Sequence, residues 1–208
     1  MLLKDHKLDD FTAVLASSSP APGGGSAAGL EGALGAALTA MVANLTDGRK
    51  AYAEHWEHAR EVAAQAQALR EKLVDVMDRD TEAYLAVTAA YALPKETDEQ
   101  KADRSAAIQK AMAGCTATPF ETMELCAQAL ELTASLMGRS NKNAASDLGV
   151  AALSLSAAMR GAWLNVCINL GSLKDRALVD SYRARGQALM EKSLPLADEI
   201  YQAVLASL

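Results

Sequence analysis

The chain has 208 residues, half of them apolar but only 4% aromatic, and a formal net charge of −6. This length suits one large domain, whose core must be built mainly from Ala, Leu, Val and Met. An acidic chain lacks the basic field of nucleic-acid-binding proteins, so that class of partner is excluded. A local basic patch can still bind an anionic small molecule.

The cysteines and the N-terminus predict a cytoplasmic protein. Three scattered cysteines form no CxxC motif and are expected to be reduced thiols. The first residues contain no long apolar segment, so we expect no signal peptide. Residues 27–45 resemble a membrane span, but they are mostly Ala and Gly and include Glu31 and Asn44. We therefore predict a buried helix and no membrane partner.

The hydrophobic pattern predicts an all-α fold, because no segment alternates with the period of a β-strand. We expect one domain over residues 1–208, a bundle of six to eight helices. The predicted helices are 8–15, 26–48, 51–93, 97–117, 118–138, 144–170 and 175–208. Residues 51–93 contain neither Gly nor Pro and predict one very long helix, or two with an unmarked break.

Capping residues and prolines set the predicted helix ends. Ser26 is expected to cap the second helix, and Thr97 opens a later one as a capping box with Gln100. Thr118, followed by Pro119 and then a Glu, is predicted to start a new helix. A break is expected at the proline near the middle of the last helix, Pro195.

One acid interrupts the apolar seam of the long helix. The seam repeats at spacings of four and three and consists of Val62, Ala66, Leu69, Leu73, Val76, Asp80, Ala83, Val87 and Ala90. Asp78 and Glu82 lie off the seam, where water can solvate them. A buried carboxyl has a raised pKa, which suits a general acid or base at Asp80. The alternative is a structural Asp satisfied by an Arg or a backbone amide.

Polar residues at the two ends of a later helix cannot share one small site within a subunit. Asp147 and Asn165 lie on one face, separated by small residues and about 27 Å at 1.5 Å per residue. The same separation applies to Ser26 and Asn44. Either some of these residues are structural, or helices of two subunits form paired sites in a symmetric dimer.

Two further motifs are weaker. His55 and His58 can in principle chelate a metal, but the pattern strongly favours a polar surface turn. Residues 20–29, PAPGGGSAAG, fit GxGxxA formally, but no strand precedes them, so a dinucleotide site is excluded. What remains is a glycine nest at a helix N-terminus that offers amides to a ligand, or a turn that allows close packing.

Together, these motifs resemble the formiminotransferase-cyclodeaminase C-terminal family, in the right order and over nearly the whole chain. The matching segments are PGGGS at 22–26, MVANLT at 41–46, DRDTEAY at 78–84, LPKET at 93–97, SDLGVA at 146–151 and NVCIN at 165–169. The region GRSNKN at 138–143 departs from the family pattern by an insertion or shift, which puts the match of Asn141 in doubt.

The resemblance implies an all-helical homodimer that acts on one-carbon adducts of tetrahydrofolate, with or without a polyglutamate tail. One reaction of the family hydrolyses 5,10-methenyltetrahydrofolate to 10-formyltetrahydrofolate. The other closes 5-formiminotetrahydrofolate to the methenyl compound and releases ammonia. The chain lacks a formiminotransferase domain, which favours the cyclohydrolase. No metal or other cofactor is implied. A folate-binding dimer without catalysis and a metal-dependent hydrolase at His55 and His58 are the alternatives.

The resemblance also implies roles for individual residues. Asp80 matches the family's acid residue and is the expected general acid/base. The expected substrate contacts are Gly23, Gly24, Gly25, Ser26, Asn44, Lys50, Asn141, Asp147 and Asn169. The carboxylates of the glutamate tail are expected to meet Lys50, Arg139, Lys142 or Lys174.

Overall fold

The computed structural model describes residues 2–208, which form helices and no strand. The α-helices are α1 (Leu8–Leu15), α2 (Gly24–Asn44), α3 (Trp56–Tyr91), α4 (Asp98–Ser135), α5 (Ala145–Leu170) and α6 (Arg176–Ser207). Three short 3₁₀ helices are η1 (Leu3–Asp5), η2 (Lys50–His55) and η3 (Lys142–Ala144). The all-α, single-domain prediction is confirmed.

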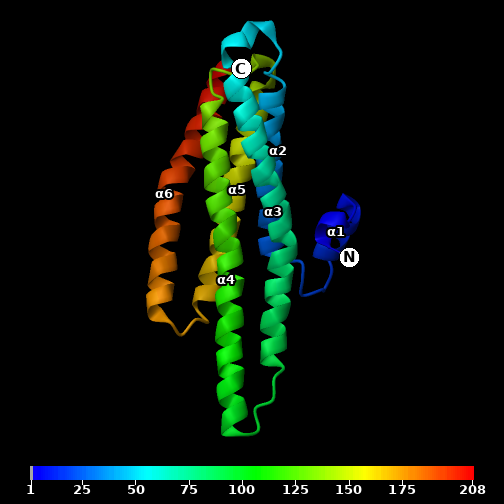
Figure 1. Ribbon diagram of the computed structural model, residues 1–208, viewed down its shortest axis with the longest axis vertical. Coiled ribbons are helices and arrows are strands. Elements are labelled where there is room, and N and C mark those ends of the chain that lie inside the picture. Colours follow the sequence, from blue (N-terminus) through cyan, green and yellow to red (C-terminus); the bar gives the residue numbers. More distant parts are fainter. Residues whose placement is uncertain (1) are drawn as a thin grey trace.

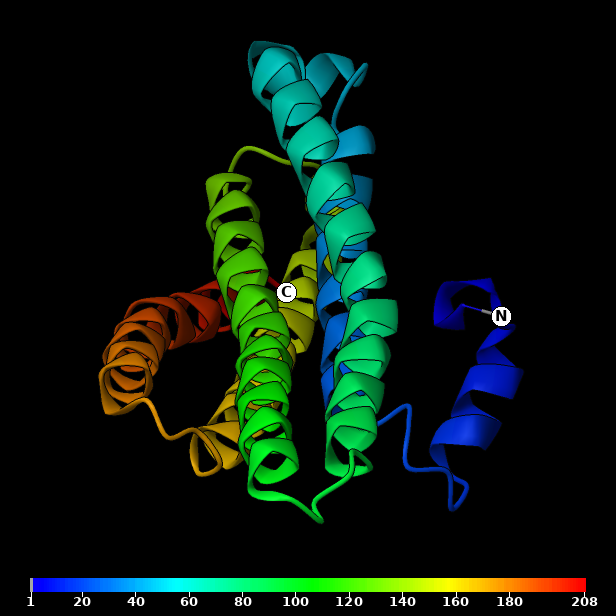
Figure 2. The ribbon, with the colours of Figure 1, turned by 60° about the horizontal axis from the view of Figure 1, so that its bottom comes forward.

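The bundle has two layers (Figure 1). In this view, α3 and α4 lie side by side in front, and α2 and α5 lie behind them. Helix α6 packs on α5 and α4, and the α3–α4 hairpin extends beyond the ends of the other helices. Figure 2 shows α1 at the edge of the bundle beside α3, and Phe11 is the residue of α1 that is buried. Helix α2 thus packs against both α3 and α5 and so contacts both layers.

Glycines let α2 approach its neighbours closely. A Cβ on Gly32 would lie 2.9 Å from the sulfur of Cys126, and one on Gly35 would lie 3.0 Å from the carbonyl oxygen of Ala151. Both distances are shorter than normal van der Waals contact, so larger side chains would force the helices apart. The small residues on the predicted face of α5 are thus explained by helix packing.

Three predictions about helix ends were wrong. Helix α4 continues through Pro119 and α6 through Pro195, so the predicted new start at Thr118 and the predicted break do not occur. Helix α2 begins at Gly24 with Gly23 as its N-cap, and the buried Ser26 lies inside its first turn. The capping box of Thr97 and Gln100 is present as predicted.

The expectation of one very long helix needs correction. Helix α3 has 36 residues without a break, but α4 has 38 and α6 has 32. The bundle is therefore built on three long helices. Tertiary packing along both sides of α4 keeps it continuous through a proline, which a local pattern cannot predict.

The membrane-span criterion identifies two segments, Gly24–Asn44 and Lys142–Leu170, by length and composition. In α2, 61% of the window is buried inside the bundle, and its contacts with α3 and α5 match the predicted buried helix. Apolar core helices meet the same criterion as membrane spans, so it is weak evidence for a membrane.

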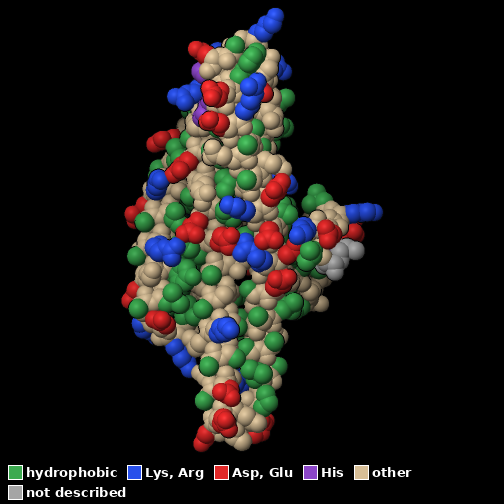
Figure 3. Space-filling view, in the orientation of Figure 1, with side chains coloured by type: hydrophobic (Ala, Val, Ile, Leu, Met, Phe, Trp, Pro, Cys, Tyr) green, Lys and Arg blue, Asp and Glu red, His purple; other side chains and the backbone are tan. Residues whose placement is uncertain are grey.

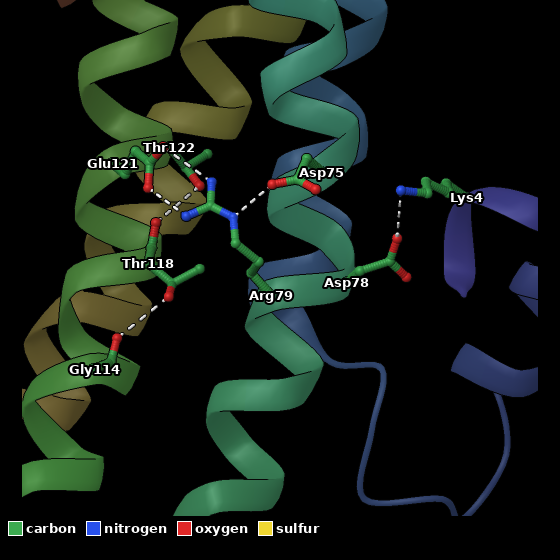
Figure 4. A network of polar contacts seen from close by, with 8 residues as sticks. All are labelled: Lys4, Asp75, Asp78, Arg79, Gly114, Thr118, Glu121 and Thr122. Carbon is green, nitrogen blue, oxygen red and sulfur yellow. Dashed lines mark hydrogen bonds and ion pairs between the residues drawn. The ribbon is translucent and has the colours of Figure 1, made fainter. Parts of the chain in front are cut away.

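A charged network ties α3 to α4 (Figure 4). The Arg79 guanidinium donates to both carboxylate oxygens of Glu121 at 2.7 and 2.9 Å and to Asp75 at 2.7 Å. We expect Arg79→Met to lower the free energy of unfolding by about 1 kcal/mol, because the bidentate pair is partly exposed. Urea unfolding measures the loss, which should shrink at high salt.

The control for this prediction is Arg70→Met. Among residues 2–208, the polar partners of the Arg70 side chain are Gln67 and Glu71 of its own helix, so its loss should cost less. Equal losses in the two variants, or a loss at Arg79 that is insensitive to salt, would contradict the proposed role of the network.

Asp78 is buried, contrary to the prediction that water solvates it. Its side chain is 7% exposed because η1 covers it. The backbone N–H of Leu3 donates to Oδ1, and the Lys4 ammonium lies 4.0 Å from Oδ2 (Figure 4). The N-terminal segment thus covers an acid that lies two residues before Asp80 and places one cation beside it.

Candidate active site

Asp80 of α3 faces the first turn of α2, in the partly buried position that the seam predicts. The Ser26 hydroxyl donates to Asp80 Oδ2 at 3.0 Å and also lies 3.1 Å from the carbonyl oxygen of Met77. No Arg or Lys pairs with Asp80 within the part of the chain that the structure describes. The carboxyl is therefore held by a neutral group rather than by a counter-ion.

Ser26 can satisfy both protonation states of Asp80. A hydroxyl carries one proton and can also accept hydrogen bonds. When Asp80 is ionised, Ser26 donates to it. When Asp80 is protonated, its O–H can donate to Ser26, and Ser26 can turn its proton to the Met77 carbonyl. Such an arrangement suits a group that gains and loses a proton.

The electrostatics of Asp80 also suit proton transfer. Burial raises the pKa of the Asp80 carboxyl above its ordinary value, while the side chain and backbone of Ser26 pull it down less strongly. A carboxyl with a raised pKa retains its proton closer to neutral pH and is a stronger base when ionised. The hydrogen bond from Ser26 and the raised pKa of Asp80 both favour a role for Asp80 in proton transfer.

The glycine loop fits closely against this carboxyl. A Cβ on Gly25 would overlap the Asp80 carboxylate, and one on Gly24 would lie 3.3 Å from Asn165 Nδ2. The first amides of a helix have no acceptor within it, so those of α2 remain available at this edge. The glycines therefore let the N-terminus of α2 reach Asp80 and leave its amides beside the same space.

A cavity of about 340 Å³ joins these groups. Its walls include Gly23, Gly24, Gly25, Asp80, Tyr84, Cys115, Asn165 and Asn169. Four segments of the chain meet here: the glycine loop, α3, α4 and the end of α5. The cavity thus places one acid–base group among amides, side-chain carboxamides and an aromatic ring.

Pro119 explains how Asn169 is held in this wall. A proline inside a helix lacks the N–H that would bond the carbonyl four residues earlier, here that of Cys115. Asn169 Nδ2 donates to the freed Cys115 oxygen at 2.8 Å. The residue that misled the prediction of helix ends therefore creates the acceptor that fixes a predicted site residue.

Comparison with known proteins identifies the family. Residues 7–188 match the model of the formiminotransferase-cyclodeaminase family. The chain belongs to this family. It is 41% identical to the methenyltetrahydrofolate cyclohydrolase of Methylorubrum extorquens, over 96% of each chain.

Other members of the formiminotransferase-cyclodeaminase family match less closely. The rat formimidoyltransferase-cyclodeaminase is 33% identical over 92% of this chain, which spans only 35% of that longer protein. The crystal structure of formiminotetrahydrofolate cyclodeaminase from Thermotoga maritima aligns with a TM-score of 0.81 at 27% identity, covering 99% of this chain and 97% of that one. The family therefore contains chains of this length as well as longer relatives.

The family motifs fall into two groups at opposite ends of the bundle. Gly23, Gly24, Gly25, Ser26, Asp80 and Asn169 lie together at the cavity. Asn44, Lys50, Asn141 and Asp147 lie at the other end, where α2 ends and α5 begins. Because α2 is unbroken, Ser26 and Asn44 are about 27 Å apart, as predicted.

Asn141, whose match to the family was in doubt, has a structural role in this chain. It is 4% exposed, and its side chain donates to the Leu45 carbonyl at 3.3 Å and accepts from the backbone of Asn143 at 3.1 Å. Its own N–H donates to Thr46 Oγ1 at 2.9 Å. These bonds join the end of α2 to η3.

The sequence analysis did not identify Cys115 as part of the cavity wall. Asn165 and Tyr84 lie within the family motifs, but they were not among the expected substrate contacts. Burial and the negative charge of Asp80 both raise the pKa of the Cys115 thiol, so it stays protonated. The cysteines show no disulfide, as expected. His58 lies 3.1 Å from Ser135 Oγ, and His55 lies 3.5 Å from Glu54, so each histidine has a partner of its own.

Proposed function

We propose that this chain is a methenyltetrahydrofolate cyclohydrolase of cytoplasmic one-carbon metabolism, which hydrolyses 5,10-methenyltetrahydrofolate to 10-formyltetrahydrofolate. The observation that carries the proposal is the match, over nearly the full length of both chains, to a relative named for this single activity. The cavity beside Asp80 supplies what the reaction requires, an acid–base group in a partly buried site.

The substrate carbon between N5 and N10 is already electrophilic, because it shares a positive charge with both nitrogens. Ionised Asp80 takes a proton from water as the water oxygen bonds to this carbon. The neutral tetrahedral intermediate then collapses: the bond to N5 breaks, protonated Asp80 returns its proton to N5, and the hydroxyl loses a proton to solvent. One water is consumed and one proton is released. One carboxyl serves both steps.

The cavity residues have distinct proposed roles. The amides at Gly23, Gly24 and Gly25 and the Asn169 carboxamide bind the polar ring of the substrate. Ser26 orients Asp80. We propose that the reaction needs no metal or other cofactor, because the substrate itself provides the activated carbon.

The second candidate is formiminotetrahydrofolate cyclodeaminase, favoured by the likeness to the Thermotoga maritima enzyme. The purified protein, before and after treatment with a chelator, is mixed with 5,10-methenyltetrahydrofolate, and the loss of the substrate's absorbance is followed against buffer. Faster decay supports the cyclohydrolase. No acceleration, with ammonia released from 5-formiminotetrahydrofolate, would replace it with the deaminase. If the protein accelerates neither reaction, a folate-binding dimer without catalysis remains. If the protein is active before treatment with the chelator and inactive after it, a metal-dependent hydrolase is favoured.

We also propose that the protein is a homodimer joined through α2 and α5. Charged side chains are interspersed over the face of α3 and α4 in Figure 3. Helix α3 exposes Tyr84, Leu85 and Tyr91 toward the hairpin end. The outer faces of α2 and α5 expose more large apolar side chains, namely Leu34, Met41, Leu45 (the C-cap of α2), Val150, Leu153, Leu164 and Ile168. A second copy that covers this surface would bury a contiguous apolar patch. It would also let Asn44, Lys50 and Asp147 of one subunit approach the cavity of the other.

The dimer proposal predicts that Leu153→Glu produces a monomer. Leu153 is 50% exposed near the middle of α5, and a buried, unpaired charge there would oppose association. Size-exclusion chromatography with light scattering measures the mass. The control is Leu205→Glu, a similarly exposed leucine on α6. A dimer that survives the first substitution, or dissociates equally with the second, would contradict this interface.

A further inference from the structure

A second cavity, of about 350 Å³, adjoins the proposed active site. Its walls include Tyr91, Arg104, Ser105, Gln109, Ser172 and Lys174. Ser172 lines both cavities, so the two are neighbours along the groove between α4 and the end of α5. Unlike the first cavity, this one has cationic walls.

Gln109 fixes the loop that carries Lys174. Its side chain donates to the Ser172 carbonyl at 3.0 Å and accepts from the Lys174 N–H at 2.7 Å. The Lys174 ammonium donates to Ser105 Oγ at 2.7 Å. Both ends of the lysine are therefore held on α4, which positions its charge before a ligand arrives.

Arg104, also on α4, is held by neutral groups at the end of α3. Its guanidinium donates twice to the Tyr91 carbonyl, at 2.9 and 3.2 Å, and lies 5.4 Å from the centre of the Tyr91 ring. Within residues 2–208, neither Arg104 nor Lys174 has a carboxylate within 4.0 Å, whereas neighbouring Lys101 pairs with Asp98. Two fixed cations thus face one cavity without acidic partners.

The substrate is long enough to span more than half of the distance from Asp80 to the far wall of the second cavity. Along α3, Asp80 and Tyr91 are eleven residues, or about 16 Å, apart. At ordinary bond lengths, the aminobenzoyl ring and its amide span roughly 10 Å from N10 to the first glutamate carboxylates. Because Ser172 lines both cavities, a substrate carbon beside Asp80 lets the tail point toward the second cavity, where Tyr91 forms part of the wall.

We propose that Arg104 and Lys174 bind the carboxylates of the glutamate tail while the one-carbon end lies beside Asp80. This inference rests on the proposed function and assigns it a tail subsite. A guanidinium provides the planar fork that fits a carboxylate, and the ammonium adds a second charge. Lys50, Arg139 and Lys142 serve this role less well within one subunit, because they lie at or near the far end of the bundle.

The test compares two substrates that differ only in the tail: 5,10-methenyltetrahydrofolate monoglutamate and the corresponding tetrahydropteroate, which has no glutamate. We expect Arg104→Gln and Lys174→Met each to raise KM for the monoglutamate roughly tenfold or more, with little change in kcat. KM for the pteroate should stay at the wild-type value. Arg104→Gln also removes the bonds to the Tyr91 carbonyl at the end of α3, so it can disturb the fold. Lys174→Met tests the same subsite without removing those bonds.

Lys110→Met is the matched control. Lys110 lies on α4 near Arg104 but lines a different, apolar groove. If Lys110→Met raises KM as much as the other two variants do, the positively charged side chains of the α3–α4 hairpin together attract the tail and no specific subsite is needed. That result would overturn the proposal. Unchanged KM for the monoglutamate, or an equal rise for the pteroate, would also overturn it. If the wild-type protein hydrolyses neither substrate, the proposed function fails instead.

Discussion

Asp80→Asn is expected to lower kcat for 5,10-methenyltetrahydrofolate hydrolysis by about 10²–10⁴-fold. An amide has nearly the shape of the carboxyl but cannot take a proton from water or return one to N5. Its carbonyl oxygen can still accept from Ser26, so the local hydrogen bond and the fold should survive. Stopped-flow absorbance of the methenyl compound measures the rate, and far-UV circular dichroism checks the helices.

Stability gives an independent reading of the same variant. Because burial raises the folded-state pKa of Asp80, the folded protein holds this proton more tightly than the unfolded chain does. The contribution to stability is therefore full below the unfolded value of 3.8 and is lost as pH rises through the raised value. At neutral pH, Asp80→Asn should be at least as stable as wild type. An active variant, or one inactive only because it unfolds, would remove Asp80 from the mechanism.

The pattern of apolar residues predicted the class of fold because it reports burial directly. The seam from Val62 to Ala90 marks the side of α3 that meets the bundle, and Asp80 stands out only against that background. Helix ends were less predictable. Thr118, Pro119 and Glu121 have the pattern of a helix N-terminus. The side chain that bonds the carbonyl freed by this proline belongs to Asn169, which lies 50 residues later and cannot be inferred from the local pattern.

The same limit applies to the site. The glycine loop and Asp80 were found because each breaks a local rule, a glycine run at a helix start and an acid in an apolar seam. Asp78 was judged solvated because the segment that covers it, η1, is distant in sequence. Arg104 and Lys174 break no local rule, and their significance depends on the shared cavity and on Gln109. Only the tertiary contacts show that these two cations line the same cavity.

The second large effect is expected at Gly25. A methyl group there would overlap the Asp80 carboxylate, so Gly25→Ala must displace either the acid or the first turn of α2. A displacement of about 1 Å at a reacting group can cost roughly 10²-fold in rate. We expect kcat to fall by about that factor while the helices remain folded, since the conflict is confined to one side chain. The same absorbance assay measures it.

Gly114→Ala is the matched control, because a Cβ at this helical position in α4 meets no atom within 4 Å. It should keep wild-type kcat and gain about 0.5–1 kcal/mol of stability, the usual difference between Ala and Gly inside a helix. Combining Gly25→Ala with Asp80→Asn separates the two possible causes. If the methyl group acts by displacing the carboxylate, it should cost little more once that carboxylate is gone, since effects at residues in contact do not add. A full additional loss would mean that the glycine serves the substrate directly, through the amides at the start of α2.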